Sequence, residues 1–263
     1  MKIVSIKVTH NFVEITLDDG EKYKVSEDFY YDEKIKANLE LTHEKLRQII
    51  EAANYHAAYL KILNKLKYRD YSEYELRTYS NDNFSLTPSE LDSIFEKLKR
   101  YDFINDERYV KYQIEKLQSK SYGYHWILQQ LKNVRIDTIL IETYLENNFD
   151  EEVARAHAIS KKIVKTIKNK SELELKNSLK SKLMTRGYSS ATVQAVVSDL
   201  DVVVDDDLER LNATKEATKV MRRLGRKHQG KELKMRLRQH LYAKGYKDQI
   251  IRDTIEEMEY ENE

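Results

Sequence analysis

The first 25 residues alternate between apolar and polar positions, which is the period of a β-strand that buries one face. The apolar members of the three alternating runs are Val4, Ile6 and Val8, then Val13, Ile15 and Leu17, and finally Tyr23 and Val25. Thr9–Asn11 separates the first two runs, and Asp19-Gly20, typical of a tight hairpin turn, separates the last two. The pattern predicts a three-stranded antiparallel meander, which is too small to be stable alone and must pack on the next part of the chain.

From about residue 42 the apolar spacing becomes helical, as in Leu46, Ile49 and Ala53. Three helix starts carry a capping box, in which a hydroxyl accepts from the first turn while a glutamate three positions later reaches back. They are Ser72 with Glu75, Thr87 with Glu90, and Ser171 with Glu174. Pro88 follows Thr87 at the one helical position that needs no N–H. Because the chain has one proline and six glycines, turns are scarce and helices are favoured.

An internal repeat sets the predicted architecture. LKSKLMTRGYSSATVQAVVSDL, residues 179–200, matches LRQHLYAKGYKDQIIRDTIEEM, residues 237–258, at a constant offset of 58. The pairs that coincide at the turn are Gly187-Tyr188 and Gly245-Tyr246. We expect each copy to hold a short helix that ends at a left-handed glycine, an aromatic side chain packed back on that helix, and a second helix.

Two weaker copies of the repeat lie upstream. In residues 127–145 the turn is Arg135-Ile136, where an arginine in place of glycine must either be strained or change the cap. In residues 75–98 the turn is Asn83-Phe84, and we expect Asn83 to adopt the left-handed conformation. One more helix precedes each copy, at about residues 52–67, 105–119, 150–169 and 207–227.

The predicted fold is all-α, with tandem three-helix repeats stacked into an elongated, curved body and a small N-terminal antiparallel β-sheet. The expected divisions are an N-terminal extension at 1–41 and three-helix units at 42–103, 104–149, 150–203 and 204–263. A body of this kind offers a long surface rather than a pocket.

Residues 225–232, GRKHQGKE, contain most of a phosphate-binding loop, with Gly225, Gly230 and Lys231 at the required spacing. Glu232 occupies the place of the magnesium-binding hydroxyl. A P-loop follows a buried strand, whereas the preceding TKEATKVMRRL has the period of an amphipathic helix. We therefore predict a turn between two helices and no nucleotide site.

The sequence contains no recognisable catalytic or metal-binding motif. The chain has no cysteine, none of its seven histidines pairs with another at metal-ligand spacing, and no Gly-x-Ser-x-Gly motif occurs. No stretch reaches the roughly 20 apolar residues of a membrane span, and the N-terminal MKIVSIKVTH lacks the apolar core of a signal peptide. We expect a cytoplasmic protein that is not an enzyme and uses no metal and no cofactor.

The formal net charge of +1 conceals two basic blocks. Residues 161–186 hold nine lysines and arginines against two glutamates, and residues 215–247 hold twelve against two. A single run of like charge is commonly a solvated helix face. Two such blocks make the binding of a polyanion a serious alternative.

Three stretches resemble the bacterial RecX regulators of the RecA recombinase, namely YRDYSEYELR at 68–77, DFINDERY at 102–109 and KSYGYHWILQQL at 120–131. The residues that match the family pattern are Arg69, Ser72, Glu75, Leu76, Asp106, Arg108, Tyr109, Lys120 and Gly123. The likeness covers roughly residues 50–260, and the N-terminal strands resemble the extension of the longer family members. Asn83 and Arg135 depart from the usual glycine.

The resemblance implies a non-enzymatic modulator that lies along the RecA–single-stranded DNA filament and restrains its growth, ATP hydrolysis and strand exchange. We expect a monomer that binds the RecA filament, binds single-stranded DNA weakly and with strong salt dependence, and has no membrane partner. The candidate partner- and DNA-binding residues are Arg69, Arg77, Arg108, Lys111, Lys120, Arg186, Arg222, Arg223, Arg226, Lys227, Arg236 and Arg238.

Structural roles compete with these assignments. Ser72 and Glu75 would then form a helix cap and have no binding role, and Arg108 would pair with the end of a neighbouring helix. Two other functions also stay open: a helical repeat protein that binds DNA without RecA, and a repeat scaffold that binds neither.

Overall fold

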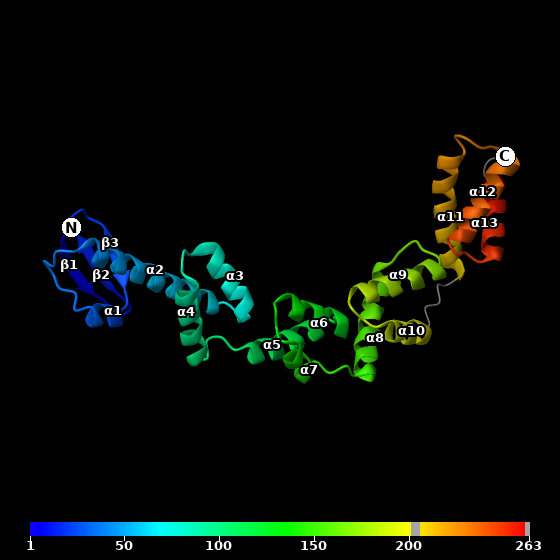
Figure 1. Ribbon diagram of the computed structural model, residues 1–263. Coiled ribbons are helices and arrows are strands. Elements are labelled where there is room, and N and C mark those ends of the chain that lie inside the picture. The colour runs from blue at the N-terminus through cyan, green and yellow to red at the C-terminus, as the bar shows by residue number, and fades with distance from the viewer. Residues whose placement is uncertain (201–205, 261–263) are drawn as a thin grey trace. The chain divides into compact units, whose positions relative to one another are not determined.

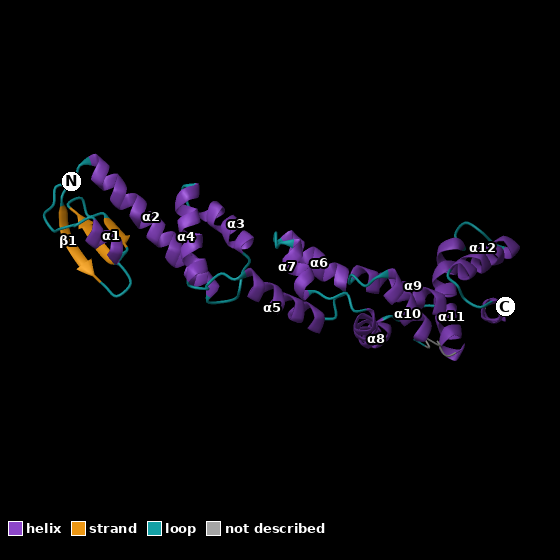
Figure 2. Ribbon diagram, turned by 60° about the horizontal axis from the view of Figure 1, so that its bottom comes forward, coloured by secondary structure: helices purple, strands orange, loops and turns teal. Residues whose placement is uncertain are grey.

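The computed structural model describes residues 1–200 and 206–260, which fold as two compact units. The first unit contains Met1–Tyr112 and Leu131–Ile141, and the second contains Gln113–Gln130 and the chain from Glu142 onward. Figure 1 labels the elements in chain order, and Figure 2 shows the strands together in the N-terminal part of the first unit. The predicted all-α class with a small N-terminal antiparallel sheet is confirmed.

The strands β1 (Ile3–Val8), β2 (Val13–Leu17) and β3 (Lys22–Val25) form the predicted antiparallel meander, in the order β1-β2-β3. Gly20, in the turn before β3, has a φ of +88°, which a glycine adopts without steric cost. Ile15 lies at the centre of β2 and is fully buried, as the alternation predicts.

In β1 the alternating valines do not mark the buried face. Val4 and Val8 are each 51% exposed, whereas Ile3 is fully buried. The register between β1 and β2 shifts between Ile3 and Ser5, so the alternation predicted from the sequence is interrupted within the strand.

A single long helix joins the sheet to the first helical bundle. The helix α2 (His43–Leu66) begins where the helical period begins, and Ile49 in its first half is buried against the sheet. Ala58 and Ile62, in its second half, are buried against the next two helices. The short helix α1 (Glu27–Asp32), which the sequence patterns did not predict, precedes it.

From α2 onward we take the helices in the predicted groups of three. The bounds after α2 are α3 (Glu73–Asn83), α4 (Pro88–Arg100), α5 (Asp106–Ser119), α6 (Tyr124–Asn133), α7 (Thr138–Tyr144), α8 (Phe149–Thr166), α9 (Glu172–Thr185), α10 (Ser190–Asp199), α11 (Asp206–Leu224), α12 (Gly230–Ala243) and α13 (Asp248–Tyr260). Separate apolar cores combine α2–α4, α8–α10 and α11–α13. The division into four units stays a prediction, and its last boundary, at 203–204, lies outside the described residues.

The predicted capping boxes are complete at α3 and α4, where both reciprocal hydrogen bonds are present. At α9 half of the prediction is wrong. Ser171 Oγ accepts from the Glu174 N–H at 3.1 Å, but the Glu174 carboxylate accepts from Lys244 Nζ at 2.8 Å. A charged partner from a distant turn has replaced the backbone N–H as the donor to this carboxylate.

The expected left-handed turn at Asn83 is also wrong. Asn83 is the last residue of α3, its Nδ2 donates to the Tyr79 carbonyl at 2.8 Å, and Phe84 is extended with φ −134°. The residues inserted before Pro88 let the chain leave the helix in an extended conformation, so no left-handed residue is needed there.

The other repeat turns agree with the prediction. Gly187 and Gly245 both have a φ of +82°, and Tyr188 and Tyr246 are 1% and 4% exposed. Each of these tyrosines lies in the apolar core that contains its preceding helix. Arg135, with φ +58°, keeps the left-handed geometry without a glycine. Of the two predicted outcomes, a strained arginine or a changed cap, the structure shows the strained arginine.

The turn that resembles a P-loop lies between two helices, as predicted. Helix α11, rather than a strand, ends at Leu224, and α12 begins at Gly230. Lys231 and Glu232 therefore belong to the first turn of α12, slightly beyond the predicted turn.

Candidate functional site

The second helix of each of the first three groups begins against the turn of the following group. At α3, Ser72 Oγ donates to the Val134 carbonyl at 3.3 Å, and at α9, Ser171 Oγ donates to the Lys244 carbonyl at 2.5 Å. At α6, where the cap residue is a glycine, the backbone N–H donates to the Arg186 carbonyl at 2.8 Å. In all three cases the accepting carbonyl comes just before the left-handed residue of a repeat turn.

A carboxylate from the following group caps the same three helices. The next backbone N–H of each helix donates to it, in the pairs Glu73 to Asp106 at 3.1 Å, Tyr124 to Glu152 at 2.7 Å and Glu172 to Glu209 at 3.3 Å. An N-terminal N–H has no partner within its own helix, and the helix dipole favours a negative charge there. We call these three contacts the helix junctions.

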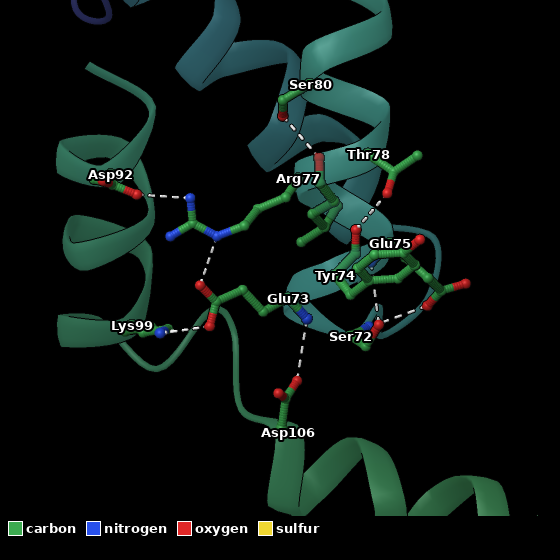
Figure 3. A network of polar contacts seen from close by, with 11 residues as sticks. Ser72, Glu73, Tyr74, Glu75, Arg77, Thr78, Ser80, Asp92, Lys99 and Asp106 are labelled. Carbon is green, nitrogen blue, oxygen red and sulfur yellow. Dashed lines mark hydrogen bonds and ion pairs between the residues drawn. The ribbon is translucent and has the colours of Figure 1, made fainter. Parts of the chain in front are cut away.

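The first junction is the centre of a charged network, shown in Figure 3. Glu73 accepts from Arg77 Nε at 2.7 Å and from Lys99 at 2.5 Å, while Arg77 Nη1 donates to Asp92 at 2.7 Å. Burial alone would raise the pKa of Glu73, but the hydrogen bonds from Lys99 and Arg77 outweigh it and hold the pKa below its ordinary value. Burial raises the pKa of Asp106. Arg77, a predicted binding residue, is thus ion-paired within the fold.

Arg69 also has a partner within the fold. Its Nη2 donates to Glu75 Oε1 at 3.0 Å, and its guanidinium lies over the Tyr71 ring at 3.5 Å from the centroid. Glu75 is the capping glutamate of α3, so Arg69 holds the carboxylate that completes the box at Ser72. The predicted capping role of Ser72 and Glu75 is confirmed by these bonds.

Arg108 binds the end of a neighbouring helix, which is its predicted structural role. Its Nη1 donates to Asp102 Oδ2 at 2.7 Å and its Nη2 to the Asp102 carbonyl at 3.2 Å, just beyond α4. Lys111 pairs with Glu107 one turn earlier on α5 at 2.6 Å, a solvent-exposed contact that adds little stability.

The structure brings together two candidate residues that are far apart in the sequence. Arg186 Nη1 donates to the carbonyls of Lys120 at 3.0 Å and Ser121 at 3.3 Å. The Arg186 guanidinium lies 5.3 Å from the centroid of Tyr122, which in turn stacks on Trp126 with an interplanar angle of 13°. Two aromatic rings and the Arg186 guanidinium therefore gather at the second junction, beside the Lys120 backbone.

Four cations at the end of α11 are left without a partner among the residues that the structure describes. Arg222, Arg223, Arg226 and Lys227 are exposed, and none of their side chains forms a hydrogen bond or ion pair within residues 1–200 and 206–260. We call these four residues the free basic cluster. On α12 the neighbouring candidates are neutralised locally, in the pairs Arg236 with Glu232 at 3.0 Å and Arg238 with Asp248 at 2.8 Å.

Sequence reasoning missed the capping carboxylates of the second and third junctions. Glu152 and Glu209, 2% and 0% exposed, are each the fourth residue of the first helix in a group, while Asp106 is the first residue of α5. Their common signal is an acidic residue in the first turn, which an exposed helix also favours for its dipole. The sequence therefore gives no sign that these carboxylates are buried.

The described residues offer neither a metal site nor a membrane span. No group of three or more histidine, aspartate or glutamate side chains is placed to hold a metal ion within residues 1–200 and 206–260. Among the helices of the same residues, none is long and apolar enough to span a membrane.

Comparison with known proteins connects this arrangement to one family. A model for a protein of unknown function (DUF1344) matches residues 1–41 and carries no functional information. The regulatory protein RecX of Streptococcus agalactiae serotype V is 28% identical over 260 residues, which are 98% of this chain and 99% of that protein. The regulatory protein RecX of Oceanobacillus iheyensis is 25% identical over 256 residues, 95% of this chain and 93% of its own length.

A crystal structure of regulatory protein RecX covers 75% of this chain and 99% of its own chain, with a TM-score of 0.59 and 20% sequence identity, and supports the fold. Because the sequence match extends over nearly the whole length of both chains, the predicted resemblance to the RecX regulatory proteins is confirmed.

Proposed function

We propose that this protein is a negative modulator of the RecA recombinase. It binds the RecA–single-stranded DNA filament and limits the filament's growth, ATP hydrolysis and strand exchange, without chemistry of its own. The observation that carries the proposal is the match to regulatory proteins RecX over 98% of the chain. A regulator that acts by contact needs an extended surface and no catalytic group, and the candidate basic residues supply cations for such a surface.

The free basic cluster supports this proposal. A cation that already has an ion-pair partner within the fold gains little from a second carboxylate or phosphate, because the first partner must be released. Arg222, Arg223, Arg226 and Lys227 have no such partner among the described residues, so their charge is available to an acidic groove or to phosphates. Acting as a monomer in the cytoplasm, the protein would reach the filament through this surface.

An ATPase assay with RecA on single-stranded DNA tests the proposal. Adding the wild-type protein should lower ATP turnover, and the protein alone should hydrolyse nothing. Charge reversal of the free basic cluster to glutamate should weaken inhibition, because an acidic groove and phosphate would both repel it. Lys231→Ala is the matched control in the same segment and should inhibit like the wild type. Undiminished ATP turnover at an excess of wild-type protein would overturn the proposal.

The dose dependence separates two modes of action. If the protein blocks filament growth at an end, a few copies per filament should inhibit strongly. If it covers the groove, inhibition should require nearly one copy per binding site along the filament. Either result supports a modulator and assigns the mode.

A second function, sequence-independent DNA binding without RecA, is favoured by the aromatic rings beside Lys120 and Arg186. Binding to RecA filaments and to bare single-stranded DNA, measured in the same buffer, distinguishes the two. Equal affinity for both would favour DNA binding alone, whereas a strong preference for the filament supports the modulator. A scaffold that binds neither would show no signal in either measurement.

A further inference from the structure

A surface hollow of about 360 Å³ lies at the second helix junction, wholly within the second unit. Its walls include Tyr122 and Trp126, from the segment that enters α6, and four residues at the end of α9: Ser181, Lys182, Thr185 and Arg186. These α9 residues share one face of the helix, because they are spaced by one and four positions. No acidic side chain is among the described residues that line the hollow.

The aromatic part of the hollow is held rigidly by the junction. A Cβ atom placed on Gly187 would lie 2.3 Å from the Trp126 backbone nitrogen, and one placed on Gly123 would lie 2.5 Å from the Gly187 carbonyl oxygen. The start of α6 can approach the repeat turn this closely only because both residues are glycines. The His125 N–H donates to the Gly187 carbonyl at 3.1 Å and fixes the approach. The backbone that carries the Trp126 indole is therefore positioned before any ligand arrives.

The rings themselves form a stack that can be extended. The Tyr122 and Trp126 centroids are 5.2 Å apart with the rings nearly parallel, and Arg186 lies over Tyr122. Tyr122 covers one side of the indole, and the partly buried Trp126 still lines the hollow. A planar aromatic ligand that enters the hollow can stack on this platform, and every nucleobase has such a face.

The cations around the platform suit a phosphate backbone. Lys182 is exposed, and its side chain forms no hydrogen bond or ion pair among the residues described. Arg186 donates to two carbonyl oxygens, which hold its guanidinium in place without neutralising the charge. Lys120, whose carbonyl is one of these acceptors, is also exposed. Stacking faces next to cations that no carboxylate among the described residues neutralises are the two components of a single-strand binding groove.

We propose that this hollow binds single-stranded DNA, with a base stacked on Trp126 and the adjoining phosphates contacted by Lys182 and Arg186. Duplex DNA is not expected to enter, because its bases are already stacked on one another inside the helix. This proposal rests on the proposed function for the choice of DNA as the ligand. It adds the residues at which the protein contacts the strand.

Trp126 is the single tryptophan of the chain, so its fluorescence reports directly on the site. Titration with oligothymidylate at low salt should quench the Trp126 emission, and a duplex of equal length should not. Lys182→Ala should weaken binding several-fold and reduce the magnitude of the log–log salt slope by about 0.7, the value for one phosphate contact on a single strand. Lys180→Ala is the matched control, because it removes the same charge about 200° around α9, away from the hollow.

The stacking contact is tested separately with a fluorescently labelled oligonucleotide. Trp126→Ala should weaken binding by about tenfold, and Trp126→Phe, which keeps an aromatic face, should restore most of the affinity. Circular dichroism spectra that match the wild type show that the variants fold. If Trp126→Ala does not fold, Tyr122→Leu, which keeps the tryptophan signal, should show the same direction of change.

Binding of the labelled strand without any change in Trp126 emission would overturn the proposed site, and so would an equal effect of the Lys180 and Lys182 variants. The RecA ATPase assay is independent of these measurements. Quenching without ATPase inhibition would leave the DNA site standing and reject the modulator, and inhibition without quenching would do the opposite.

Discussion

The Tyr124 backbone N–H donates to Glu152 Oε1 at 2.7 Å, so that a carboxylate on α8 caps the helix α6 that precedes it in the chain. The other oxygen, Oε2, accepts from Thr192 Oγ1 on α10 at 2.8 Å. A buried carboxylate with both oxygens hydrogen-bonded ties three helices together, and removing it takes this acceptor from two donors, of which Thr192 Oγ1 also lies 2.8 Å from Ser189 Oγ.

Replacement of Glu152 should therefore destabilise the second unit. For Glu152→Ala we expect a loss of about 2–4 kcal/mol in the free energy of unfolding, because a partly buried N–H and a buried hydroxyl lose this acceptor. Urea unfolding followed by Trp126 fluorescence measures this loss, since the tryptophan lies in the same unit. Glu151→Ala, at an exposed position on the same turn, is the control and should change little. Equal stability of the two variants would contradict a capping role.

Gly187 should tolerate no side chain. Its φ of +82° costs an ordinary residue about 1–2 kcal/mol, and the added Cβ would also collide with the Trp126 backbone. We expect Gly187→Ala to lower the free energy of unfolding by at least about 3 kcal/mol. Gly230 also has a positive φ, +55°, but nothing among the described residues lies within 4 Å of its Cβ position, so Gly230→Ala isolates the conformational term. The prediction fails if the two variants unfold at the same urea concentration.

The first junction should lose stability in acid through Glu73. A carboxylate whose pKa is lower in the folded state than in the unfolded state contributes stability above the unfolded pKa. That stability is lost as the pH falls through the lowered folded pKa, which for Glu73 lies below the ordinary value of 4.5. Urea unfolding of wild type and Glu73→Gln should differ most at neutral pH, and the difference should shrink below about pH 4. A difference that stays constant from neutral to acid pH would show that the charge of Glu73 is not involved.

Single-stranded DNA binding should be weak and strongly salt-dependent. If about four phosphates are contacted, log K should fall with log salt at a slope near −3, from about 0.7 per phosphate. Replacing the free basic cluster by glutamine should flatten this slope. Arg236 and Arg238, which are already ion-paired, provide the comparison, and their double alanine variant should change the slope less. If the slope is unchanged when the free basic cluster is neutralised, the DNA-binding face lies elsewhere.

Much of the local structure could be predicted because its causes are local. The turn at Asp19-Gly20, the cap at Ser72 and the left-handed Gly187 each depend on residues within one turn of the chain. The prediction of a left-handed Asn83 was wrong. The residues inserted before Pro88 allow the chain to leave α3 in an extended conformation, and the sequence shows the insertion but not the conformation it adopts. The predicted capping bond of Glu174 was wrong because its carboxylate has two possible donors, the backbone N–H of the cap and Lys244 Nζ. The sequence favours the backbone N–H, which is nearer along the chain.

The candidate binding residues also depend partly on the sequence and partly on the tertiary structure. The sequence selected Lys120 and Arg186 as cations, but their contact across 66 positions, and the aromatic pair beside them, depend on how α6 meets the turn after α9. Likewise, many arginines were plausible binding residues from charge alone. Only the structure separates Arg77, which is held between Glu73 and Asp92, from Arg222, which has no partner in the described part of the chain.

By itself the sequence determined the three strands, the helices after residue 42, the repeat with its glycine turns, and the resemblance to a family through motifs in a fixed order. The tertiary structure alone decided which acidic residue caps which helix, which cations stay free among the described residues, and where Trp126 is presented. The physical reason is that capping, turn geometry and apolar periodicity are set by neighbours along the chain, whereas the partner of a buried carboxylate such as Glu152 is set by packing between distant segments.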